Sequence, residues 1–177
     1  MVIEPLSLDD INRKAPYKVW ESATDGSFRF MSDSEIIFVV DFMEDDLIIS
    51  SNTFQLIIGN VENKKSPRDM KVRITILAIV EEFFIKNRAA LLYICETGDG
   101  RQMARGRLFA YWFESSSQRR LFTTMTSTLV DEEGIENTAT LIIRNDNPDM
   151  NKLIAEFTQT VTYLSQKPSN GHVDSGV

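Results

Sequence analysis

Cysteine and histidine are almost absent from this chain, and their scarcity excludes several kinds of chemistry. Among 177 residues there is one of each, Cys95 and His172. One cysteine cannot form an internal disulfide, so we expect a protein of a reducing compartment. A Cys–His nucleophile and a Ser–His–Asp triad both need a histidine beside the nucleophile, and His172 belongs to the C-terminal tail. The sequence therefore predicts neither arrangement, and no histidine-based metal site.

Long apolar runs are also missing. No stretch approaches the ~20 apolar residues that a membrane-spanning helix needs. The start, MVIEPLSLDD, has neither the basic nor the apolar region of a secretory signal. The formal net charge is −7, whereas domains that coat nucleic acid are usually basic. We therefore expect a cytoplasmic protein that contacts neither a membrane nor nucleic acid.

What the sequence does have is the composition of one globular domain. Hydrophobic residues make up 42% and charged residues 25% of the chain, ordinary values for a chain long enough to bury a core. Residues 1–15 show little periodicity and are expected to be a loosely ordered lead-in. Residues 166–177 are rich in Pro, Gly and Ser and are expected to be a disordered tail. Residues 16–165 then form a single domain.

Strand signals dominate the first half of that domain. Apolar and polar residues alternate on both sides of a TDG turn, which predicts a hairpin over 17–23 and 27–32. Runs of β-branched and aromatic residues predict two further strands, over 36–43 and 54–59. Four strands connected by turns are therefore expected before the first long helix.

The second half alternates helices with strands. Ser66 as N-cap and Pro67 as first helical residue predict a helix that continues to about residue 87. The elements expected after it are an apolar strand over 89–95 covered on both faces, a helix over 100–114, strands over 121–130 and 138–144, and a last helix from Asn147–Pro148 to about residue 164. The predicted class is α+β, with the order β-β-β-β-α-β-α-β-β-α and helices packed on a mixed, mostly antiparallel sheet.

One arginine lies on the apolar side of the helix expected over 100–114. At about 100° per residue, Arg105 falls in the apolar stripe, between Trp112 and Phe109. A buried, unpaired guanidinium costs several kcal/mol. Arg105 therefore needs a carboxylate, a group of carbonyls or a bound anion beside it, and it is the strongest indication of a site in this sequence.

A second arginine has a similar position near the start of the preceding helix. Asp69 and Arg73 are four residues apart, so their side chains share one helical face, and Arg73 lies beside Val80 on that face. Two interpretations stay open. In one, Asp69 pairs with Arg73 or Arg105 and the long arginine stems extend to the rim. In the other, Arg73, Arg101 and Arg105 line a pocket for an anion or a partner, with positive potential from the helix N-termini.

An acidic patch lies at the end of the third expected strand. Asp41, Glu44, Asp45 and Asp46 are close in sequence, but DFMEDD lacks the alternating spacing and the glycine of a calcium loop. Such a patch is typical of a solvated turn, and no metal site is predicted.

Two strings carry a family resemblance. YICETGDGRQMARGRLFAYWF, over 93–113, and RDMKVRITILAIVEEFFIKN, over 68–87, resemble a family of small bacterial domains of unknown function, found mainly in Bacteroidetes. The resemblance covers roughly residues 17–164. It implies a bacterial cytoplasmic protein, and it assigns no catalytic residue.

The expected order of elements is similar to the core of the GCN5-related acyltransferases. In that family, the pyrophosphate of acyl-coenzyme A binds backbone N–H groups at the start of the helix after the fourth strand. The glycine-containing Q/RxxGxG/A loop of the family is replaced here by NKKSPRDM, and Pro67 removes one N–H donor. The likeness is therefore one of fold order, which does not imply activity.

The preferred hypothesis is a non-enzymatic module that binds a protein or a small anion, without a cofactor, near Arg73 and Arg105. The alternative is an acyltransferase-like enzyme that uses acetyl-coenzyme A. In that case Tyr111 is the candidate general acid, and Lys64, Lys65 and Arg68 lie near the cofactor phosphates.

Overall fold

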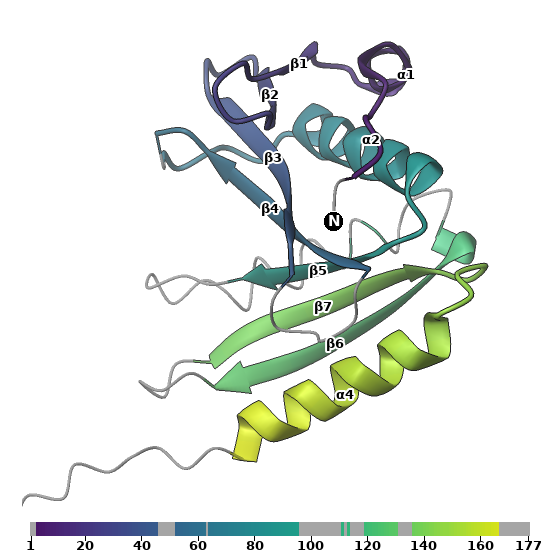
Figure 1. The fold of residues 1–177 in the computed structure, drawn as a ribbon. Helices are drawn as coiled ribbons and strands as arrows, with labels where there is room; N and C mark the ends of the chain where they lie inside the picture. Colours follow the sequence, from purple (N-terminus) through teal and green to yellow (C-terminus); the bar gives the residue numbers. More distant parts are fainter. Residues whose placement is uncertain are drawn as a thin grey trace, which may run out of the picture.

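A seven-stranded mixed sheet forms the centre of the structure, with the strand order β1-β2-β3-β4-β5-β7-β6 (Figure 1). The computed structural model describes residues 3–45, 52–62, 64–95, 111, 113, 119–130 and 136–166. The strands are β1 (Val19–Glu21), β2 (Phe28–Met31), β3 (Ile37–Glu44), β4 (Thr53–Asn60), β5 (Ala90–Cys95), β6 (Phe122–Val130) and β7 (Glu136–Arg144). The helices within these residues are α1 (Leu8–Lys14), α2 (Met70–Lys86), α4 (Met150–Gln166) and the 3-10 helix η1 (Arg119–Leu121).

Neighbouring strands run antiparallel everywhere except between β4 and β5. These two are parallel and pair over a short stretch, from Thr53↔Ala90 to Gln55↔Leu92. A parallel neighbour requires a crossover connection, and α2 supplies it because it lies between β4 and β5 in the chain. The predicted α+β class, with a mixed and mostly antiparallel sheet, is confirmed.

Helix α2 covers one face of the sheet. Phe83 on this helix is fully buried, and its ring lies against Phe42 of β3, Phe54 of β4 and the neighbouring Phe84. On the same side, Phe84 contacts Phe122 of β6. Aromatic pairs of this kind contribute beyond the area that they bury, so the α2 face holds the larger part of the core.

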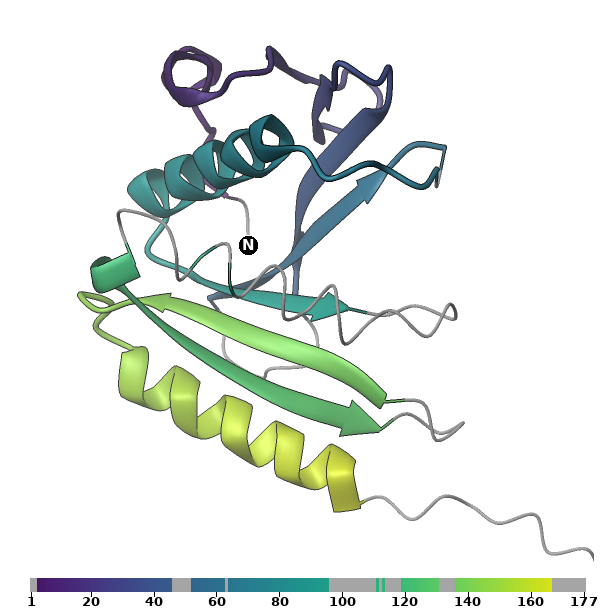
Figure 2. The same ribbon diagram turned by 180° about the vertical axis from the view of Figure 1, so that it is seen from behind.

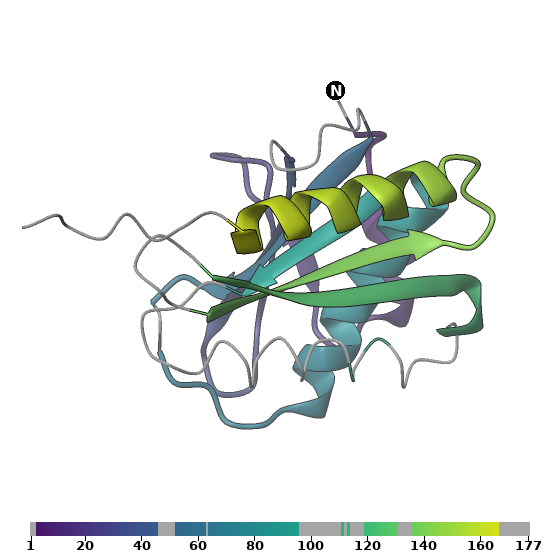
Figure 3. The same cartoon turned by 90° about the horizontal axis from the view of Figure 1, so that it is seen from below.

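Helix α4 covers the opposite face of the sheet, along β6 and β7 (Figures 2 and 3). Leu153 and Phe157 of α4 are buried together with Leu92 of β5 and Leu141 of β7. The alternate β5 residue, Leu91, belongs to the core on the α2 side. Strand β5 is therefore buried on both faces, which confirms the prediction drawn from its continuous apolar run.

The N-terminal residues correct the expectation of a loosely ordered lead-in over 1–15. Residues Leu8–Lys14 form α1, and Ile11 is fully buried. Ser7 caps the helix through its hydroxyl, while its own N–H donates to Oε1 of the buried Glu82 at 3.2 Å. In a capping box the carboxylate that accepts from the cap N–H comes from the same helix. Here it comes from α2, so a local sequence pattern does not reveal it.

Two further predictions fall largely outside the described residues. Of the helix expected over 100–114, only Tyr111 and Phe113 are described, and both are helical. The expected tail begins at residue 166, which is the last residue of α4, and residues 167–177 lie outside the described part. None of the described helices is long and apolar enough to cross a membrane.

Candidate functional site

Helix α2 begins later than the sequence predicts. Its N-cap is Asp69 rather than Ser66, with an extended backbone at φ −134° and ψ 113°. Asp69 Oδ1 accepts a hydrogen bond from Lys71 N at 2.8 Å, and Pro67 therefore precedes the helix. Serine and aspartate are both good caps. The aspartate is favoured here because its second carboxylate oxygen has a partner from a distant part of the chain.

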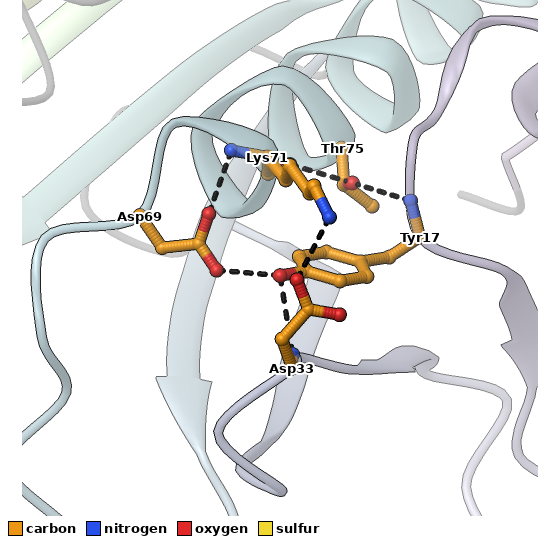
Figure 4. Close-up of polar contacts among 5 residues, drawn as sticks. All are labelled: Tyr17, Asp33, Asp69, Lys71 and Thr75. Carbon is orange, nitrogen blue, oxygen red and sulfur yellow. Dashed lines mark hydrogen bonds and ion pairs between the residues drawn. The ribbon is translucent and has the colours of Figure 1, made fainter.

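That partner is Tyr17, which lies just before β1 and is buried (Figure 4). Its hydroxyl donates to Asp69 Oδ2 at 2.6 Å and accepts from the N–H of Asp33 at 3.1 Å. The backbone N–H of Tyr17 donates to Thr75 Oγ1 at 3.3 Å, and that hydroxyl donates to the carbonyl of Lys71 at 2.8 Å. One tyrosine thus connects α2 to the loop between β2 and β3.

Burial and a hydrogen bond to the neighbouring Asp69 carboxylate raise the pKa of the Tyr17 hydroxyl. Lys71 Nζ lies 5.5 Å from the Tyr17 ring centroid and binds Asp33 Oδ2 at 2.7 Å. The Lys71 ammonium holds the pKa of the Asp33 carboxyl below its usual value, and Asp33 in turn raises the pKa of Lys71. These groups satisfy one another, as expected of a structural network.

The structure brings together two of the residues singled out in the sequence, Arg73 and Tyr111. The Arg73 guanidinium lies 5.8 Å from the centroid of the Tyr111 ring, within the range of a cation–π contact. Arg73 Nη1 also lies 4.0 Å from the sulfur of Met70. Tyr111 and Met70 are 62% and 63% exposed, and Arg73 is half-buried. A continuous, solvent-accessible contact set of Met, Arg and Tyr therefore flanks the start of α2.

Asp69 and Arg73, one of the two pairs that the sequence suggested, have separate partners, and the other pair, Asp69 with Arg105, stays a prediction. The Asp69 carboxylate accepts from Tyr17 and from the backbone of Lys71, while Arg73 is directed at Tyr111. Asp69 therefore has a helix-capping role. Arg101 and Arg105 lie outside the described residues.

Basic residues are close in sequence to this contact set. Residues 64–73, KKSPRDMKVR, contain five cations and one carboxylate in a chain whose net charge is −7. Lys64 pairs with Glu62 and Lys71 with Asp33. Lys65 and Arg68 are exposed and make no ion pair within the described part of the chain. We refer to Lys64, Lys65, Arg68, Met70, Lys71, Arg73 and Tyr111 as the α2 surface.

The acidic patch at the end of the third strand, with Asp41 and Glu44 inside β3, also differs from a fully solvated turn. Asp45 is buried, and its Oδ1 accepts from Gln55 Nε2 at 3.0 Å. Asp46 lies outside the described residues. Among the residues that the structure describes, no three His, Cys, Asp or Glu side chains are grouped as a metal site would require.

Sequence reasoning missed Tyr17, Asp33 and Lys71. Tyr17 and Asp69 are separated by 52 positions, and no periodicity or motif links residues so far apart. Of these three residues, only Lys71 belongs to the basic segment 64–73, whose charge density is visible in the sequence alone.

Residues 68–159 match the sequence model of a family of unknown function, DUF6169. The chain belongs to this family. The matched region runs from Arg68, just before α2, into α4, and it covers just over half of the chain. DUF6169 thus includes most of the α2 surface with Arg73 and Tyr111, whereas Tyr17 and Asp33 precede the match. No curated protein and no solved structure matches the chain.

Proposed function

We propose that this chain is a non-enzymatic interaction module that binds an acidic segment of another protein at the α2 surface. The observation that carries the proposal is the exposed contact set of Met70, Arg73 and Tyr111 among the cations of residues 64–73. Tyrosine, arginine and methionine are the residue types enriched in protein interfaces. A cationic rim steers an acidic partner and selects against a basic one.

The neighbouring polar network supports a binding role over catalysis. Tyr17 donates to the Asp69 carboxylate, and Asp69 also caps α2. Both Asp69 oxygens accept hydrogen bonds from groups of the fold itself, which gives this carboxylate a structural role. Tyr111 is the candidate general acid of the acyltransferase alternative. Its ring lies against the Arg73 guanidinium, and tyrosine and arginine are both frequent at the centre of protein interfaces.

The first test is a titration with a fluorescein-labelled oligoglutamate peptide. We expect saturable binding that weakens as salt is added, because exposed charge interactions are screened. Lys65→Glu/Arg68→Glu should weaken the binding by about tenfold or more, since attraction becomes repulsion at the rim. Tyr111→Ala should also weaken it, because a central aromatic contact is lost.

The matched control is Arg88→Glu/Lys152→Glu, which makes the same change in net charge at an exposed arginine beyond the C-terminal end of α2 and at an exposed lysine on α4. Its affinity for the peptide should stay close to that of the wild type. An equal loss in both double variants would mean that net charge alone matters, and the proposed surface would be wrong. Absence of binding by the wild type at low salt would also contradict the proposal.

A second candidate, an acyl-coenzyme A-dependent acyltransferase-like enzyme, is favoured by the order of the elements. Four antiparallel strands are followed by α2 and then by β5, parallel to β4, as in the GCN5-related resemblance. The start of α2, however, fits a pyrophosphate poorly. Pro67 has no N–H, and the Asp69 carboxylate occupies the N–H of Lys71 and places negative charge there.

Calorimetric titration with acetyl-coenzyme A separates the two candidates. Because of the Asp69 carboxylate, we expect no measurable binding of acetyl-coenzyme A at about 1 mM, a concentration that corresponds to a binding free energy of only about −4 kcal/mol. Coenzyme A without the acetyl group serves as the control for phosphate binding alone. Micromolar binding of acetyl-coenzyme A would favour the enzyme and contradict the non-enzymatic proposal.

A further inference from the structure

The two edges of the sheet differ in how their backbone groups are satisfied. At one edge, β1 is only three residues long. There the side-chain amide of Asn12 accepts from Val19 N at 2.7 Å and donates to Val19 O at 2.9 Å. Asn12 thus takes the position that a further strand would need. Short edge strands covered in this way prevent edge-to-edge association.

The other edge has none of these protections within the described residues. Strand β6 pairs with β7 in one uninterrupted register of nine residue pairs, from Phe122↔Arg144 to Val130↔Glu136. Its sequence, FTTMTSTLV, contains no charged residue, no proline and no glycine. Charges, prolines and bulges are the usual devices that block an edge strand. Strand β6 therefore presents a long, regular and neutral edge.

The register identifies which backbone groups point outward. The N–H of Asn145 donates to the carbonyl of Leu121 at 2.9 Å, which continues the β6–β7 ladder by one pair. In an antiparallel ladder, hydrogen-bonded and non-hydrogen-bonded pairs alternate. Thr126 and Thr140 form a non-bonded pair, and their hydroxyls lie 3.0 Å apart, as such close pairs allow. The outward groups are therefore those of Phe122, Thr124, Thr126, Thr128 and Val130.

We propose that the β6 edge pairs with β6 of a second copy of this chain, antiparallel and about a twofold axis at Thr126. This register places Thr126 opposite the partner subunit's Thr126, and Thr124 opposite the partner subunit's Thr128. Each such pair exchanges two hydrogen bonds. All five outward residues of both strands are then paired, and the two sheets become one continuous sheet.

Charge complementarity supports a second copy as the occupant. Two exposed arginines, Arg119 and Arg120, precede β6, and the sequence continues after it with DEE, residues 131–133. Antiparallel self-pairing places the end of one strand, after which the sequence turns acidic, beside the start of its partner, which follows two arginines. The neutral strand between them avoids like-charge repulsion, even though each chain has a net charge of −7. This pairing does not depend on the α2 surface.

The test is light scattering coupled to size-exclusion chromatography, over about 1 to 100 μM protein. We expect the wild type to reach twice the mass of one chain and to dissociate on dilution. Thr126→Lys places two like charges opposite each other at the twofold axis and should weaken the dimer by about tenfold or more. Thr126→Pro removes an outward N–H, a position where an edge strand tolerates proline, and should have the same effect.

Thr24→Lys, in the exposed turn between β1 and β2, adds the same charge elsewhere and should leave the dimer intact. Circular dichroism of each variant verifies that it is folded. Hydrogen exchange of the wild type provides an independent measurement, because the amides of Thr124, Thr126 and Thr128 should become protected as concentration rises. A wild type that stays monomeric at every concentration, or folded Thr126 variants that dimerise like the wild type, would overturn the proposal.

Discussion

Replacement of Phe83 by alanine is expected to lower the free energy of unfolding by about 3–5 kcal/mol, the usual cost of removing a fully buried aromatic side chain. Phe83 has no exposed surface. Its ring centroid lies 4.5 Å from that of Phe42, 5.9 Å from that of Phe54 and 5.4 Å from that of Phe84. Three rings on two strands and the helix therefore lose their common neighbour, and rigid β-strands cannot collapse into the space.

Urea unfolding followed by tryptophan fluorescence or circular dichroism measures this change. Ile85→Ala is the matched control, because Ile85 lies on the same helix but is 55% exposed. Its loss should stay under about 1 kcal/mol. Since single domains are stable by only about 5–15 kcal/mol, Phe83→Leu provides a milder variant that should fold. Equal losses for Phe83→Ala and Ile85→Ala would contradict the packing described here.

Tyr17→Phe is expected to cost about 1–3 kcal/mol, because it removes one hydroxyl that makes two hydrogen bonds. The Asp69 carboxylate loses a donor at 2.6 Å, and the Asp33 N–H loses its acceptor. The ring and its packing on Phe30 are retained, so the variant isolates the hydroxyl. Tyr163→Phe, at an exposed position on α4, is the control and should be neutral in the same denaturant experiment.

The same tyrosine should give the protein an alkaline limit of stability. The pKa of Tyr17 is raised in the folded state, first by burial and then by the Asp69 carboxylate. The unfolded chain therefore loses the phenolic proton at lower pH than the folded chain. The contribution of Tyr17 is fully present below about pH 10, the ordinary tyrosine value, and is lost as pH rises through the folded pKa. Unfolding free energies measured from pH 8 to 11 should fall more steeply for the wild type than for Tyr17→Phe. Parallel curves would contradict this assignment.

Local sequence patterns were sufficient for most of the secondary structure. The alternation around the TDG turn predicted the β1–β2 hairpin, and the continuous apolar run of β5 predicted burial on both faces. Both predictions are confirmed. They succeed because side-chain periodicity reports directly which face of a strand is buried. The charge density of residues 64–73 was also visible in the sequence, which singled out Arg73 as a binding residue and Tyr111 as a candidate general acid, but not the contact between them.

Features that depend on distant contacts could not be predicted in this way. The sequence near α1 shows no complete capping box, because the carboxylate that accepts from the Ser7 N–H belongs to Glu82 of α2. Residues 1–15 are therefore predicted to be a loosely ordered lead-in. The start of α2 was assigned to Ser66 because nothing near Asp69 in the sequence reveals Tyr17. Local propensity treats two good capping residues alike, and the tertiary contact selects between them.

The sequence by itself determined the α+β class, the positions of most strands and helices, and a basic segment in an acidic chain. Only the tertiary structure decided that Asp69 caps a helix instead of pairing with Arg73, that Arg73 meets Tyr111 at the surface, and that Asn12 covers one sheet edge while β6 leaves the other open. The physical reason is range: periodicity and charge are properties of neighbouring residues, whereas each of these contacts joins side chains and backbone groups that only the packed fold brings together.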